Sequence, residues 1–142
     1  MRISELMRTP AVTCRTTTSL GEVARVMRDR EVGCVLVLDE TDYLAGVVTD
    51  RDLALRGLGV GRTADTLVRD VMSRDVVSVS VRADVSEAAA LMAKRSVRRL
   101  PVVDEHDHPR GVITLDDLVR DLGAEADLLV DTIVLQSSRR SW

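Results

Sequence analysis

Two short segments of the chain combine glycine, threonine and aspartate at the same spacing, Gly46–Asp52 and Gly111–Asp117. In each segment two apolar residues follow the glycine, as in a strand, and the threonine stands where a helix would begin. The free backbone N–H groups at a helix start attract anions. A threonine hydroxyl can donate to a phosphate oxygen, and an ionised aspartate can accept both vicinal hydroxyls of a ribose. The pattern therefore suits the binding of a nucleoside phosphate.

The same spacing also has a purely structural interpretation. Threonine followed three residues later by aspartate is a good helix cap. Gly46 and Gly111 could serve merely to shape a turn. On spacing alone, both interpretations stay open.

Other residues with chemical potential form weaker patterns. Asp104–His108 looks like a metal cluster, but the matching residues Asp39–Tyr43 indicate a polar hairpin turn, and a four-coordinate site needs more convergent ligands. Both histidines lie in that one loop, so we expect no catalytic triad, no enzyme and no metal site. Cys14 is expected to be a buried small apolar residue, and we expect no redox role for Cys34.

The two segments belong to a tandem duplication. Shifting the sequence by 65 residues aligns it with itself without gaps, placing Met7 on Met72 and Glu22 on Glu87. Each copy predicts the order strand, helix, strand, strand, helix. The first strands are predicted at 11–13 and 76–79, and the first helices follow capping-box sequences that begin at Ser19 and Asp84.

We therefore predict an α+β fold of two units packed by pseudo-twofold symmetry, because about 50 residues cannot bury enough surface to fold alone. The first copy is assigned to 1–56, a linker to 57–69, the second copy to 70–122 and a C-terminal helix or tail to 123–142. The glycines of the linker do not match the dinucleotide-binding pattern, so we expect a flexible connection and not a phosphate loop.

Composition and hydropathy argue against several functional classes. With 142 residues, a net charge of −3 and 1% aromatic residues, the chain suits neither phosphate-driven nucleic-acid binding nor base stacking. Its longest purely apolar run, Cys34–Leu38, is too short to span a membrane. The first residues lack the apolar core of a signal peptide, so we expect a cytoplasmic protein.

The repeated Gly–Thr–Asp segments, together with Val97–Asp104, resemble the CBS-domain family, and more closely its small stand-alone bacterial CBS pairs. The resemblance implies a non-catalytic regulatory module that binds an adenine nucleotide (AMP, ADP, ATP or a related adenosyl compound) in the cleft between the copies. It also implies a flat homodimer and an unknown effector protein. The alternative is a ligand-free scaffold for dimerisation or protein interaction, in which the helices at the seam and the tail carry the function.

The resemblance also implies which residues bind. In the family, backbone near the first strand contacts the base, and β-branched residues could line an adenine slot without aromatics. Arg51 could contact phosphate, whereas its counterpart Asp116 would repel it, so we favour the cleft that uses Thr49, Arg51 and Asp52. The predicted binding residues are Thr49, Arg51, Asp52, Thr114, Asp117, Thr13, Ser78, Val32, Val97 and Arg98.

Overall fold

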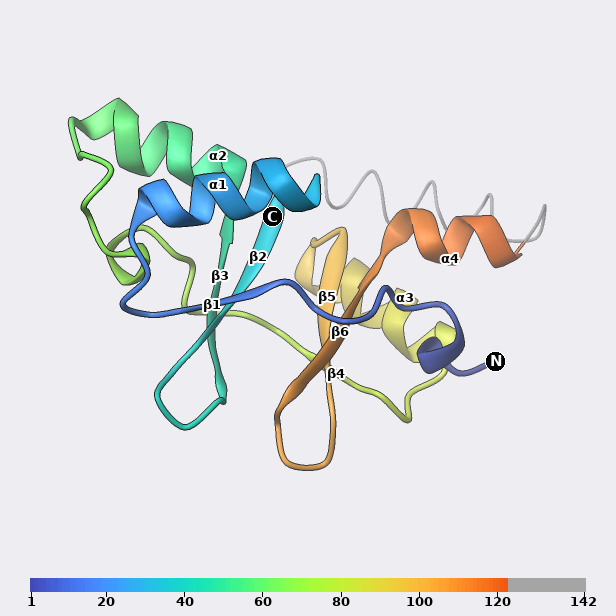
Figure 1. Cartoon of the computed structure of the whole chain (residues 1–142). Coiled ribbons are helices and arrows are strands. Elements are labelled where there is room, and N and C mark those ends of the chain that lie inside the picture. The colour runs from blue at the N-terminus through green and yellow to red at the C-terminus, as the bar shows by residue number, and fades with distance from the viewer. Residues whose placement is uncertain (123–142) are drawn as a thin grey trace. The chain divides into compact units, whose positions relative to one another are not determined.

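The computed structural model describes residues 1–122 and divides the chain into two compact units (Figure 1). The first unit is Ala11–Val76, and the second unit joins Met1–Pro10 to the chain from Val77 onward. Each unit has one three-stranded sheet accompanied by helices, which confirms the predicted α+β duplication. The helix predicted for 123–142 lies outside the described residues. Within the described part, no helix is long and apolar enough to cross a membrane.

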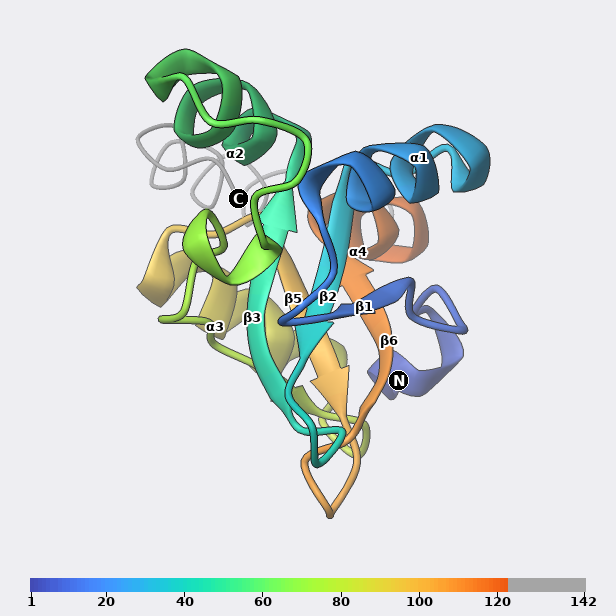
Figure 2. The same cartoon turned by 60° about the vertical axis from the view of Figure 1, so that its left-hand side comes forward.

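In the first unit, the middle strand β2 pairs with β1 in parallel and with β3 in antiparallel orientation (Figure 2). A very short α-helix after β3 continues as a π-helical turn. The elements in chain order are β1 (Thr13–Arg15), α1 (Leu20–Arg30), β2 (Cys34–Leu38), β3 (Leu44–Thr49), α2 (Asp50–Asp52), η2 (Leu53–Gly57), η3 (Leu58–Val60) and η4 (Val68–Asp70).

The second unit repeats this sheet, with β5 between a parallel β4 and an antiparallel β6. Its elements are η1 (Ile3–Glu5), β4 (Val79–Ser80), α3 (Val85–Arg95), β5 (Arg99–Val103), β6 (Pro109–Thr114) and α4 (Leu115–Leu122). The two first strands begin later than predicted, because their pairing with the middle strands starts only at Thr13 and Val79.

The long helices α1 and α3 begin as their sequences predict. The Ser19 hydroxyl and the Asp84 carboxylate accept hydrogen bonds from the third residue of the helix, and that residue's glutamate accepts one from the cap's own N–H. A hydrogen bond from the Ser86 hydroxyl and one from the Glu87 N–H hold the pKa of Asp84 below its ordinary value. These caps satisfy backbone groups that would otherwise lack partners.

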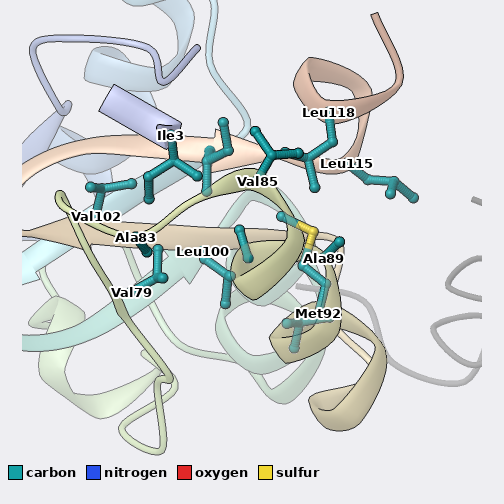
Figure 3. Packing of buried hydrophobic residues seen from close by; sticks show 13 residues of the cluster. Ile3, Val79, Ala83, Val85, Ala89, Met92, Leu100, Val102, Leu115 and Leu118 are labelled. Atoms are coloured by element: carbon teal, nitrogen blue, oxygen red, sulfur yellow. The ribbon is translucent and has the colours of Figure 1, made fainter. Parts of the chain in front are cut away.

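Two equivalent segments, the N-terminal segment (Ile3–Arg8) and the connecting segment (Val68–Ser73), run along the two sheets. Arg8 exchanges backbone hydrogen bonds of 2.9 and 3.1 Å with Val112 of β6, and Ser73 exchanges bonds of 2.8 and 3.0 Å with Val47 of β3. Ile3 is fully buried among the core residues of the second unit, where Figure 3 shows it close to Val102.

Each of these two segments packs in the unit formed mainly by the other sequence copy. The N-terminal segment lies in the first sequence copy but completes the second unit, and the connecting segment, at the junction of the linker and the second copy, completes the first unit. The compact units therefore differ from the sequence copies 1–56 and 70–122. The physical reason is burial, because Ile3 and Val68 are both 0% exposed in the units they join.

Candidate functional site

The two Gly–Thr–Asp segments have the same geometry in both units. Thr49 N donates to Asp52 Oδ2 at 2.9 Å, and Asp52 N donates to Thr49 Oγ1 at 3.2 Å. Thr114 and Asp117 repeat these two bonds at 2.9 and 3.2 Å. Each pair forms a reciprocal cap at the junction of strand and helix, so the structural interpretation of the spacing is confirmed.

This cap leaves hydrogen-bonding capacity for a ligand. A threonine hydroxyl has one donor and two acceptor positions, and the cap uses one acceptor. Each aspartate gives Oδ2 to the cap, so Oδ1 is the oxygen left to face other groups. The two carboxylates are shielded unequally, because the side chain of Asp52 is 14% exposed and that of Asp117 is 5% exposed. Capping and ligand binding are therefore compatible roles for the same residues.

Sheet topology brings the predicted residues of the first unit to one end of its sheet. Because β1 and β2 are parallel and β3 is antiparallel, the starts of β1 and β2 lie at the same end as the end of β3. Thr13 begins β1 and is exposed, and Thr49 ends β3 opposite Cys34. Val32 is half-buried just before β2, while Arg51 is exposed on the first turn of α2.

The second unit places its predicted residues in the same way. Ser78 is half-buried just before β4, and Thr114 ends β6 opposite Arg99. Val97 is 7% exposed and belongs to the core, so it is more enclosed than Val32. Arg98 is exposed, and its carbonyl accepts a 2.7 Å hydrogen bond from Leu115 N at the start of α4. The predicted residues within each unit thus gather at one end of one sheet.

Two arginines that the sequence did not indicate lie at the aspartates. Arg8 Nε donates to Asp117 Oδ1 at 3.4 Å across 109 residues of sequence. In the first unit, Arg56 Nη1 lies 3.5 Å from Asp52 Oδ1. The duplication could not reveal either contact, because the residues matching Arg8 and Arg56 are Ser73 and Asp121. In the sequence, the i, i+4 spacing of Asp52 and Arg56 was the one sign that an arginine could lie near an aspartate of these pairs.

The glycines of the two segments have a steric role. A Cβ on Gly111 would lie 2.6 Å from the carbonyl oxygen of Arg8, and one on Gly46 would lie 2.6 Å from that of Ser73. The glycines therefore make room for the N-terminal and connecting segments. Their place in the repeated pattern is explained by this close approach of two backbones.

The hairpin at Asp104 is a turn stabilised by its own aspartate. The Asp104 carboxylate accepts hydrogen bonds from His106 N at 2.9 Å and His108 N at 3.1 Å, as Asp39 does in the other hairpin with Thr41 N and Tyr43 N. Across residues 1–122, no group of three or more histidine, cysteine, aspartate and glutamate side chains is placed to hold a metal ion.

Cys14 lies in β1 and packs against the core of the first unit. Burial raises the pKa of its thiol to about 12. The thiol therefore stays protonated at neutral pH, and a protonated thiol is a poor nucleophile. This fits the predicted role of a small apolar packing residue.

The first unit also contains a cavity of about 310 Å³, distinct from the predicted binding residues. Apolar side chains of α1, η2 and the residues after η2 form most of its wall, with Asp50, Arg62 and Thr63 as its polar members. None of the predicted binding residues lines this cavity.

Comparison with known proteins identifies the repeated unit. The family model described as CBS domain matches residues 3–58 and again 68–124. The CBS domain-containing protein YhcV of Bacillus subtilis is 35% identical over 116 residues, which cover 82% of this chain and 81% of the relative. The uncharacterized protein MK0525 of Methanopyrus kandleri is 33% identical over 83% of this chain, and the match spans 61% of that relative's length. The relatives thus include archaeal and bacterial proteins, so a specifically bacterial group is not established.

Two solved structures with named ligands have the same fold. The CBS domain pair of protein MJ0100, in complex with 5′-methylthioadenosine and S-adenosyl-L-methionine, superposes with a TM-score of 0.75 at 23% identity, covering 88% of this chain and 98% of that one. The cytosolic domain of the Mg²⁺ channel MgtE in complex with ATP has a TM-score of 0.74 at 32% identity, covering 85% of this chain and 48% of that one. With two matches to the family model and the same fold in both units, the chain belongs to the CBS-domain family as a tandem pair.

Proposed function

We propose that the chain is a non-catalytic regulatory module that binds an adenosyl compound through its two Thr–Asp pairs. The observation that carries the proposal is the identical Thr–Asp geometry in the two units, with Oδ1 of each aspartate outside the cap. That oxygen can accept a ribose hydroxyl, and the threonine O–H can donate to a 5′ group. A ligand that binds one arrangement of the module better than another would pass its bound state to a partner protein.

Similarity to ligand-bound relatives supports the class of ligand. The MJ0100 pair was solved with two adenosyl compounds and the MgtE domain with ATP. The adenosine is common to all three, whereas the 5′ substituents differ in charge and size. We therefore propose adenosine recognition as the shared property and extend it to AMP, ADP and ATP as candidates. A cytosolic location, a homodimer and an effector protein belong to the same proposal.

Thermal-shift titration with AMP, ATP, 5′-methylthioadenosine and S-adenosyl-L-methionine tests the proposal. A compound that binds the folded state raises the melting temperature with concentration. Asp52→Ala is expected to weaken binding about 10- to 100-fold, because a hydrogen bond to a charged group is worth about 1.5–3 kcal/mol. Isothermal titration calorimetry gives the change in affinity.

Asp84→Ala is the matched control for this substitution. It removes an aspartate that caps α3 in the same reciprocal way but lies outside the two Thr–Asp pairs. It should lower the melting temperature of the free protein and leave the ligand-induced increase intact. If none of the compounds raises the melting temperature of the wild-type protein, ligand binding is rejected.

The second candidate function is a scaffold for dimerisation or protein interaction. Three apolar side chains after α2 favour it, because Leu55 is 53% exposed, Leu58 78% and Val60 65%. Leu58→Asp is expected to lower the sedimentation coefficient of any oligomer that this face forms, with the exposed Tyr43→Asp in the β2–β3 turn as the control. An unchanged sedimentation profile in Leu58→Asp would contradict a role for this face in assembly.

A further inference from the structure

Both carboxylate oxygens of Asp117 are already engaged by the protein. Thr114 N donates to Oδ2 at 2.9 Å, and Arg8 Nε donates to Oδ1 at 3.4 Å. The Asp117 side chain is 5% exposed, so few other directions of approach to the carboxylate are open. A ribose hydroxyl that approaches Oδ1 therefore competes with the guanidinium of Arg8 for this oxygen.

Arg8 is anchored by its backbone, whereas its side chain is exposed. Its N–H and C=O pair with Val112 at 2.9 and 3.1 Å, which fixes its Cα beside β6. Its side chain is 64% exposed, so the guanidinium can leave Asp117 and be hydrated by water. An ion pair with one exposed partner is weak enough to be exchanged for a ligand.

The first unit holds a looser form of this arrangement, an ion pair of Asp52 with Arg56 in place of the hydrogen bond from Arg8 to Asp117. Ser73 holds the position equivalent to Arg8 and has no charge to offer to Asp52. The arginine near Asp52 is Arg56, whose Nη1 lies 3.5 Å from Asp52 Oδ1 and is shared with Ser73 Oγ at 3.4 Å. Asp52 is also the more exposed of the two carboxylates, at 14% against 5%.

From this asymmetry we infer that Arg8 competes with the ribose for Asp117 and makes the second Thr–Asp pair the weaker of two unequal sites. The inference rests on the proposed function. It makes Arg8, in the N-terminal segment, a specificity-determining residue of the second Thr–Asp pair. The duplication offers no equivalent arginine, since Ser73 holds the matching position. Because the competition concerns the ribose and not the 5′ group, it applies equally to charged and uncharged adenosyl compounds.

The test measures the second site alone. In an Asp52→Ala background, isothermal titration calorimetry with ATP and with 5′-methylthioadenosine gives the affinity of the Thr114–Asp117 site. Adding Arg8→Ala is expected to tighten the binding of both compounds about two- to fivefold, the range set by a partly exposed ion pair. Arg82→Ala, which removes an exposed arginine of the same unit, is the charge-matched control and should change neither affinity.

The outcomes separate the inference from the function on which it rests. Unchanged affinity for both compounds in the Arg8→Ala variant would overturn competition. Weaker binding of ATP alone would also overturn it, because that result would make Arg8 a partner of the phosphate. If the Asp52→Ala protein binds nothing and gains binding with Arg8→Ala, competition is supported in its strongest form. If the wild-type protein binds both compounds, but the Asp52→Ala variant and the variant that combines Asp52→Ala with Arg8→Ala bind neither, the inference fails while the proposed function stands. If the wild-type protein binds neither compound, the proposed function itself fails.

Discussion

Ile3→Ala should destabilise the protein by about 2–5 kcal/mol, the cost of deleting a branched side chain from a packed core. Ile3 is 0% exposed, and its backbone N–H donates to the Ala83 carbonyl at 3.1 Å. It belongs to the buried core cluster of the second unit, which also includes Val85 and Val102 (Figure 3). The free energy of unfolding from urea denaturation measures the loss.

Ser4→Ala is the control, because this exposed neighbour lies on the same short helical turn. We expect it to change stability by less than about 0.5 kcal/mol. Val68→Ala, at the equivalent buried position of the first unit, should be costly in the same way as Ile3→Ala. Equal stabilities of Ile3→Ala and Ser4→Ala would mean that the N-terminal segment is not part of the second core.

The second large effect is expected for Gly111→Ala, at about 1–3 kcal/mol of destabilisation, the range of overpacked sites. The new Cβ would lie 2.6 Å from the Arg8 carbonyl oxygen and 3.1 Å from the Met7 sulfur. The oxygen is a backbone atom whose own residue is hydrogen-bonded to Val112, so relief requires moving the N-terminal segment. Gly46→Ala should act alike on the connecting segment.

Gly21→Ala separates this steric effect from the general effect of replacing glycine. A Cβ there would meet the Cβ of Ala64 at 3.3 Å, and the residue lies in α1, where alanine favours the helix by up to about 1 kcal/mol. Its stability should therefore fall far less than that of Gly111→Ala in the same urea experiment. Hydrogen exchange of the Arg8 amide should accelerate in Gly111→Ala, and protection equal to wild type would count against a displaced segment.

The local features of the fold could be predicted from the sequence because their interactions span a few residues. The caps at Ser19 and Asp84 and the pairs at Thr49 and Thr114 join groups three residues apart. The hairpin turns are stabilised in the same local way, by bonds to residues two and four positions on. The duplication made these predictions firmer, since each pattern occurs twice, and the similarity to the CBS-domain family agreed with them.

The repeated unit, its element order and the residues of the two Thr–Asp pairs could therefore be inferred without the structure. Three features became visible only in the folded chain: which segment completes which core, why Gly46 and Gly111 lack side chains, and that Arg8 lies at Asp117. These three depend on contacts between segments far apart in the chain, 109 residues apart in the case of Arg8 and Asp117. Neither periodicity nor spacing records such contacts, because they arise only when the burial of Ile3 and Val68 brings their segments against the sheets.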